Sequence, residues 1–207
     1  MKGFRTDTAL HSRHHRSAWH KHSYASPNER DFFDFTLAAG GRPTEILTKE
    51  RTYHIDGETI FVKPIAPAHT DGDIIVYFKN ADVLVHGDTF WNGIYPFIDN
   101  ARGGSIDGAI AAANEALGMC TDRTVVVPGH GPTGDRAHLT AFRDMLVGVR
   151  KNVAALKKQG KSLDEVLAAK PSAEYDPTWG QFVIDPALFD RLVYQGLGRH
   201  SSGQSSH

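Results

Sequence analysis

The sequence predicts an α/β fold with one main domain. Short apolar runs bounded by turn residues indicate strands up to about residue 85, and apolar residues spaced three and four apart indicate helices further along the chain. The 207 residues are 40% hydrophobic and 23% charged, which is typical of a globular chain with a single core. We expect a poorly ordered His-rich segment over residues 1–30, the domain over 31–197, and a disordered Ser/Gly/His tail over 198–207.

The expected strands are short and come mostly in pairs. Asp56-Gly57 is a hairpin turn signal between the first two strands. The next two runs are continuously apolar, so we expect them to be buried on both faces of a sheet. The predicted strands are Arg51–Ile55, Glu58–Ile65, Ile74–Phe78, Val83–Val85 and Val125–Val127, the last stopped by Pro128.

Helices are indicated by caps and by periodic apolar residues. Ser105 can cap a helix in which Ile106, Ile110, Ala113 and Leu117 share one face. A long helix over residues 135–159 follows and is stopped by a glycine. The last two helices begin at a capping box and at an Asp-Pro pair, namely Ser162-Leu163-Asp164-Glu165 and Asp185-Pro186.

Charge and cysteine usage exclude several classes of protein. The formal net charge is -1 and the pI is near 6.9, so we expect neither nucleic acid nor an anionic membrane as a partner. No apolar run approaches the roughly 20 residues of a membrane span, and the first 30 residues lack a secretory core. We expect a cytoplasmic protein, or a secreted or periplasmic one if a signal segment precedes this sequence. The single cysteine, Cys120, cannot form an internal disulfide.

Three polar clusters directly follow expected strands. A sheet can aim side chains at such strand ends toward one point, and imidazole and carboxylate are groups that zinc selects. Taken singly, each cluster is also explained by an ordinary turn or by a packed histidine. Their order along the chain favours a metal site. The clusters are Ala68-His69-Thr70-Asp71-Gly72-Asp73, His86-Gly87-Asp88-Thr89 and Pro128-Gly129-His130-Gly131-Pro132.

This series resembles the later motifs of the metallo-β-lactamase superfamily: a ligand His, a Gly-Asp whose carboxylate bridges two metals, and a Gly-His after the last strand. The resemblance covers Thr52 to about Leu197 and is similar to the β-lactamase-like or glyoxalase-II-like hydrolase branch. It implies an αββα sandwich with His69, Asp88 and His130 as metal ligands, of which Asp88 and His130 are also catalytic. One or two zinc ions are the implied cofactor.

The resemblance also implies a reaction. In that family a zinc-bound hydroxide attacks an ester, thioester or lactam, so the expected partner is a small-molecule substrate. Asp73 and His86 are expected to support the ligands without binding metal. Trp91, Asn92 and Tyr95 follow the Asp88 cluster and are candidates for lining the substrate pocket, although packing explains them equally well.

The family's His-x-His-x-Asp-His motif is absent. The nearest segment, residues 11–15, has neither the spacing nor the Asp. The implied sandwich and ligand set are therefore incomplete in their amino-terminal half, and three hypotheses stand. The chain is a shortened or mis-started hydrolase, a truncated non-catalytic metal-binding or partner-binding remnant, or a plain α/β domain with turn residues only. A missing β-layer would expose apolar sheet face and favour oligomers.

Overall fold

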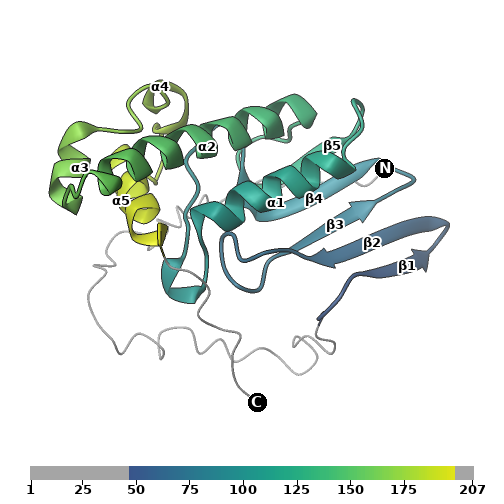
Figure 1. Cartoon of the computed structure of the whole chain (residues 1–207). Coiled ribbons are helices and arrows are strands. Elements are labelled where there is room, and N and C mark those ends of the chain that lie inside the picture. The colour runs from purple at the N-terminus through teal and green to yellow at the C-terminus, as the bar shows by residue number, and fades with distance from the viewer. Residues whose placement is uncertain (1–46, 199–207) are drawn as a thin grey trace, which may run out of the picture. The chain divides into compact units, whose positions relative to one another are not determined.

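A computed structural model describes residues 47–198, which form one mixed five-stranded sheet with helices (Figure 1). The predicted segment 1–30 and the tail beyond residue 198 lie outside the described residues. The strand order is the order along the chain, with antiparallel neighbours except for the parallel pair β4 and β5. The α/β fold class is thus confirmed. The strands are β1 (Arg51–Ile55), β2 (Glu58–Pro64), β3 (Ile74–Phe78), β4 (Val83–Trp91) and β5 (Val125–His130).

The helices begin where the sequence places their caps. The side chains of Ser105, Asp135 and Asp185 each accept a hydrogen bond from a backbone N–H three residues on, and Ser162 forms the predicted capping box with Glu165. Two single-turn helices, η2 and α4, are too short to show a period in the sequence. No helix among residues 47–198 is long and apolar enough to cross a membrane. The helices are η2 (Asn100–Arg102), α1 (Ile106–Met119), α2 (Arg136–Lys158), α3 (Leu163–Ala169), α4 (Asp176–Trp179) and α5 (Pro186–Gly196).

The last two strands are longer than predicted. β5 continues through Pro128 to His130, because Pro128 lies opposite Gly87 at an irregularity of the ladder. At such a bulge the missing N–H of proline breaks no regular hydrogen bond. β4 likewise continues to Trp91, so Asp88 lies inside a strand rather than in a loop after it. A strand position holds a side chain more rigidly than a loop does.

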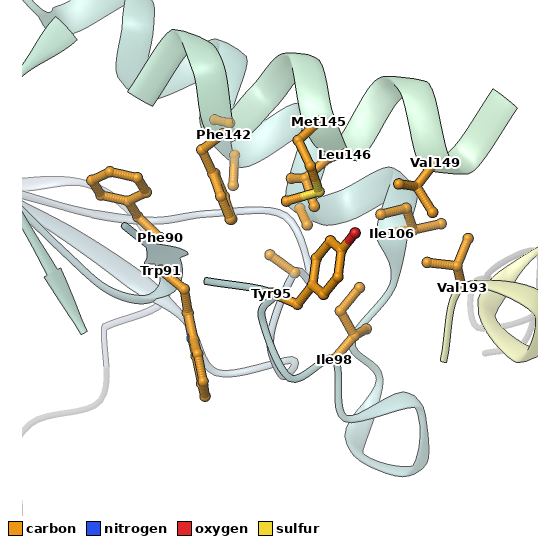
Figure 2. Packing of buried hydrophobic residues seen from close by; sticks show 14 of the residues in the cluster. Phe90, Trp91, Tyr95, Ile98, Ile106, Phe142, Met145, Leu146, Val149 and Val193 are labelled. Atoms are coloured by element: carbon orange, nitrogen blue, oxygen red, sulfur yellow. The ribbon is translucent and has the colours of Figure 1, made fainter. Parts of the chain in front are cut away.

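Helices α1 and α2 cover one face of the sheet (Figure 1). On that face Ile75, Leu84 and Val126 have no exposed surface. Above them the rings of Phe90 and Phe142 meet edge to face with centroids 5.2 Å apart (Figure 2). The core of the described residues therefore lies between the sheet and these helices and continues from α2 to α3 and α5. β4 carries the residues that join this core to the site.

The prediction that the strands of residues 74–78 and 83–85 are buried on both faces is wrong for the described residues. Val76 and Val85 point away from the helices and remain partly exposed, whereas their neighbours Ile75 and Leu84 are fully buried. The strands alternate because no described helix or strand packs on the second face of the sheet.

A carboxylate buried away from the sheet gives the fold a pH dependence. Asp190 on α5 is 2% exposed; its Oδ2 accepts a hydrogen bond from Ser172 Oγ at 3.2 Å, and its Oδ1 has no partner. Burial raises the pKa of Asp190 to about 7, and the negative charge of Asp176 adds to the rise. The folded chain therefore holds this proton more tightly than the unfolded chain does.

Replacing Asp190 with Asn is expected to remove a loss of stability at neutral pH. Since the folded pKa of Asp190 is raised, its contribution to stability is fully present below about pH 4 and is lost as pH rises to about 7, by up to about 4 kcal/mol. Melting temperatures of both proteins at pH 5 and pH 8 measure the effect. The melting temperature of the Asn variant, relative to that of the wild type, should be higher at pH 8 than at pH 5. The same difference in melting temperature at both pH values would contradict the raised pKa of Asp190.

Candidate metal centre

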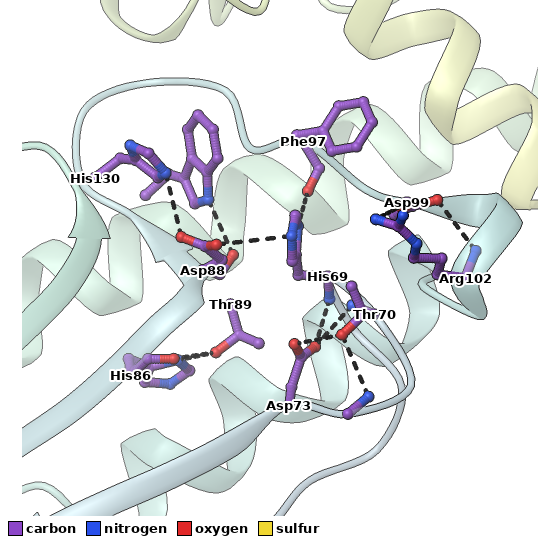
Figure 3. Close-up of polar contacts among 12 residues, drawn as sticks. His69, Thr70, Asp73, His86, Asp88, Thr89, Phe97, Asp99, Arg102 and His130 are labelled. Carbon is purple, nitrogen blue, oxygen red and sulfur yellow. Dashed lines mark hydrogen bonds and ion pairs between the residues drawn. The ribbon is translucent and has the colours of Figure 1, made fainter. Parts of the chain in front are cut away.

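The carboxylate of Asp88 lies between two imidazoles (Figure 3). Its Oδ2 is 3.7 Å from Nε2 of His69, and its Oδ1 is 3.2 Å from Nε2 of His130. His69 comes from the loop between β2 and β3, Asp88 from β4 and His130 from the end of β5. The three residues that the sequence singled out as metal ligands are thus brought together in one place.

A backbone carbonyl fixes the orientation of His69. Its Nδ1 lies 2.8 Å from the carbonyl oxygen of Phe97, and since a carbonyl can only accept, Nδ1 carries the proton. Nε2 is then the ring nitrogen that faces Asp88 and can offer a lone pair to a metal ion. A lone pair facing a carboxylate is an arrangement that a cation between them stabilises. The contact with Phe97 O could not be predicted from the sequence, because it comes from the backbone.

Asp73, directly before β3, holds the loop that carries His69. Its Oδ2 accepts hydrogen bonds from the backbone N–H groups of His69 at 2.7 Å and Thr70 at 3.0 Å. Its Oδ1 accepts from the Thr70 hydroxyl at 3.0 Å. These contacts fix the loop backbone, and Asp73 makes none of the contacts that join the two imidazoles to Asp88 (Figure 3).

Replacing Asp73 with Ala is expected to weaken zinc binding about 10- to 100-fold, the usual effect of losing a group that orients a ligand. The loop would lose the three hydrogen bonds that Asp73 accepts from His69 and Thr70. Zinc affinity measured by competition with a chromophoric chelator tests this. The matched control is Asp71→Ala in the same loop, where the carboxylate is exposed. Equal affinities for the two variants would remove the proposed role of Asp73.

Trp91 touches two of the three site residues. Its Nε1 donates to the backbone oxygen of Asp88 at 2.9 Å, and its ring lies on that of His130 with centroids 3.9 Å apart and planes 36° apart. Trp91 is 5% exposed, whereas the side chains of Asp88 and His130 are each 43% exposed. A rigid buried indole therefore supports an Asp and a His that are open to solvent.

The approach of β5 to Asp88 depends on Gly129. A Cβ at this position would lie 2.7 Å from the carbonyl carbon of Gly87 and 2.8 Å from the backbone nitrogen of Asp88, and it would also clash with Oδ1 of Asp88. Glycine is thus sterically required directly before His130, because any side chain at position 129 would push β5 away from Asp88.

The side chain of His86 contacts Thr89 and Phe90. It is fully buried, its Nδ1 contacts the hydroxyl of Thr89, and its ring meets Phe90 edge to face. The Thr89 hydroxyl in turn donates to the His86 carbonyl at 2.7 Å. Burial lowers the pKa of His86 to about 4, so the ring is neutral at neutral pH. These contacts are those of a packed core histidine.

The candidate pocket residues are placed differently from one another. Trp91 lies at the site, as described above. Asn92 is nearly buried and its Nδ2 donates to the Pro132 carbonyl at 2.8 Å, which ties the loop after His130 to β4. Tyr95 has no exposed surface and donates its hydroxyl proton to Asp176 Oδ1 at 2.8 Å. Tyr95 therefore belongs to the core and not to the surface of the site.

The donor atoms fit zinc in pairs. Two ligands about 2.1 Å from a tetrahedral zinc ion lie roughly 3.4 Å apart. The separations of 3.7 Å for His69 and 3.2 Å for His130 from Asp88 lie on either side of that value. The imidazoles face different oxygens of Asp88. Among residues 47–198, no three His, Cys, Asp or Glu side chains converge so as to hold one ion together.

Two comparisons with known sequences agree on the class of protein. The sequence profile of the metallo-beta-lactamase superfamily matches residues 4–130, so the match begins well before Thr52 and ends at His130. The chain is 28% identical over 134 residues to the probable metallo-hydrolase YqgX of Bacillus subtilis (strain 168), covering 58% of this chain and 61% of that one. It thus spans less than two thirds of this curated relative.

A solved structure shares the fold. The stereoselective inverting sec-alkylsulfatase Pisa1 from Pseudomonas sp. matches 79% of this chain and 28% of its own length, with a TM-score of 0.59 and 21% identity. At that identity the likeness concerns the fold alone.

Proposed function

Since the chain belongs to the metallo-beta-lactamase superfamily, we propose that it is a zinc-dependent hydrolase of an ester, thioester or lactam. The observation that carries the proposal is the carboxylate of Asp88, with one oxygen facing His69 and the other facing His130. The name of the curated relative, a probable metallo-hydrolase, supports the same class of reaction.

The three residues would hold up to two zinc ions. Nε2 of His69 and Oδ2 of Asp88 would serve one ion, and Nε2 of His130 and Oδ1 of Asp88 the other. Zinc, when bound, supplies a Lewis acid that activates water near neutral pH and stabilises developing negative charge.

The chain's own groups orient these ligands. The Phe97 carbonyl keeps the proton of His69 on Nδ1, so the lone pair of Nε2 stays available to bind a metal ion. Trp91 holds the ring of His130 by a tilted ring contact and holds the β4 backbone at Asp88 through its N–H. The exposed side of Asp88 and His130 is the side from which a small-molecule substrate can approach.

The number of ligands limits the affinity. Catalytic zinc sites usually have three protein ligands, whereas residues 47–198 provide two for each ion. We therefore expect weaker zinc binding than in a complete site. The same count favours the alternative proposal, a non-catalytic metal-binding remnant of the fold, which would bind zinc without turnover.

Metal analysis of the purified chain, combined with assays on a chromogenic ester, a thioester and a chromogenic lactam, separates these proposals. Zinc at one or two ions per chain, with turnover that His69→Ala abolishes, is the expected result. His138→Ala is the matched control, because His138 is an exposed histidine paired with Asp135 on α2. Bound zinc without turnover would establish the alternative. Absence of zinc binding at His69 and His130 would overturn both.

A further inference from the structure

Of the three proposed ligands, His69 is the one that does not lie in a strand. It belongs to the loop between β2 and β3, whereas Asp88 lies in β4 and His130 ends β5. A loop places a side chain less precisely than a strand does, and a metal ligand must be held within about 0.5 Å of its productive position. Contacts from other parts of the chain, in addition to those of Asp73, must therefore position His69.

Residues 97–105 contact His69 through both its ring and its backbone, and we call this segment the His69 seat. The carbonyl oxygen of Phe97 accepts from Nδ1 of the ring at 2.8 Å. The backbone N–H of Asp99 donates to the carbonyl oxygen of His69 at 2.9 Å. The segment therefore fixes the orientation of the imidazole and the position of the backbone that carries it.

The His69 seat lies so close to the loop that one of its positions requires glycine. A Cβ at Gly104 would lie 2.2 Å from the carbonyl oxygen of His69 and 2.8 Å from that of Ala68. Both are backbone atoms, which cannot turn aside as the end of a flexible side chain can. The N–H of Ser105 also donates to the Ala68 carbonyl at 2.9 Å. The backbone of the His69 loop thus packs directly on the seat.

The side chain of Asp99 holds the His69 seat in its shape. Its Oδ1 accepts hydrogen bonds from the backbone N–H groups of Ala101 and Arg102, each at 3.1 Å, and so caps η2. Its own carbonyl accepts from the N–H of Gly104 at 2.9 Å. Oδ2 is 3.5 Å from NH1 of the exposed Arg102, and so long an ion pair contributes little. The cap is therefore the main contact of this carboxylate.

We infer that Asp99 is a positioning residue for His69. By capping η2 it keeps the His69 seat in the shape that directs Nε2 of His69 toward Asp88. In Figure 3 the dashed lines from Asp99 run to Arg102 and not to Asp88, so Asp99 acts through the backbone of the seat. The inference rests on the proposed zinc site, in which Nε2 of His69 is a ligand.

NMR of the histidine rings in the metal-free chain, followed by zinc titration of the same proteins, tests the inference. At about pH 8 an ordinary histidine is neutral, so the nitrogen chemical shifts report which ring nitrogen carries the proton. The signals that disappear in His69→Gln belong to His69. In the wild type the proton of His69 should lie on Nδ1, where the Phe97 carbonyl accepts it.

Asp99→Ala should give a mixture of the two neutral forms of the His69 ring, because the seat loses its cap. Zinc binding should weaken by about 5- to 30-fold, the factor by which loss of a helix cap shifts a local equilibrium. Gly104→Ala, which presses directly on the His69 carbonyl, is the second variant and should change the ring signals in the same way. Circular dichroism checks that each variant folds.

Two control variants separate positioning from general stability. Asp99→Asn should keep the ring signals and the zinc affinity of the wild type, because an amide oxygen can still accept from both N–H groups. Asp185→Ala removes a cap of the same kind from α5. It should lower the melting temperature and leave the His69 signals and the zinc affinity unchanged.

An Asp99→Ala variant with the ring signals and zinc affinity of the wild type would overturn the inference. Equal losses in Asp99→Asn or in Asp185→Ala would overturn it as well. A wild type that binds no zinc, but whose His69 proton leaves Nδ1 in Asp99→Ala, would overturn the proposed function and support the role of Asp99 in placing His69.

Discussion

Replacing Asp88 with Asn is expected to weaken zinc binding by about a hundredfold or more. The carboxylate is the one group that faces both imidazoles, and the amide removes its negative charge and one of its two donor oxygens. If the roughly 10–16 kcal/mol of a four-ligand zinc site is shared among its ligands, losing one costs about 3 kcal/mol, or roughly a hundredfold. Titration calorimetry with zinc measures the loss.

The fold should tolerate this substitution. The hydrogen bond from Trp91 Nε1 goes to the backbone oxygen of Asp88, so the amide leaves it in place. Asp122→Asn, at an exposed position before β5, is the matched control and should bind zinc as the wild type does. An Asp88→Asn variant with unchanged zinc affinity would remove Asp88 from the site.

Replacing Gly129 with Ala is expected to lower both stability and zinc affinity. The added methyl group would press on the backbone at Gly87 and Asp88, so β5 must move away from β4 and carry His130 with it. Overpacking of this kind costs about 1–3 kcal/mol, which corresponds to a fall in melting temperature of about 2–12 °C for a chain of this size. Differential scanning calorimetry with and without zinc measures both effects.

Gly118→Ala provides a control of opposite sign. Gly118 lies in α1, and a Cβ there would meet nothing within 4 Å. Alanine in a helix is favoured over glycine by about 0.8–1.0 kcal/mol, so this variant should melt higher than the wild type. If Gly129→Ala were as harmless as Gly118→Ala, the close approach of β5 to Asp88 would not be a feature of the folded protein.

The sequence predicted the elements whose signals are local. The cap at Ser105, the capping box at Ser162 and the Asp185-Pro186 pair mark where helices begin, and the Asp56-Gly57 turn connects the first hairpin. The extension of β5 past Pro128 could not be predicted in this way. It depends on Gly87 of another strand lying opposite the proline at an irregular point of the ladder.

The residues of the candidate site were easier to predict than what surrounds them. His69, Asp88 and His130 stood out by their order and by the small residues beside them, and the structure brings them together. The role of the Phe97 carbonyl had no signal, since any residue offers a carbonyl. Tyr95 looked like a pocket residue because it is aromatic and close in sequence, but its hydroxyl is turned to Asp176 in the core.

The same local reasoning misjudged how the strands are buried. Continuous apolar runs predict burial on both faces, and Ile75 and Leu84 are buried while Val76 and Val85 are not. A run of valines records that a strand face is suited to packing, but it does not identify the surface that covers it.

Crystals grown with zinc should show, by anomalous diffraction at the zinc edge, one or two peaks beside Asp88. Each peak should lie about 2.0–2.2 Å from a carboxylate oxygen and from Nε2 of His69 or His130. Zinc bound only at other residues, or no peak beside Asp88 at saturating zinc, would contradict the proposed zinc site.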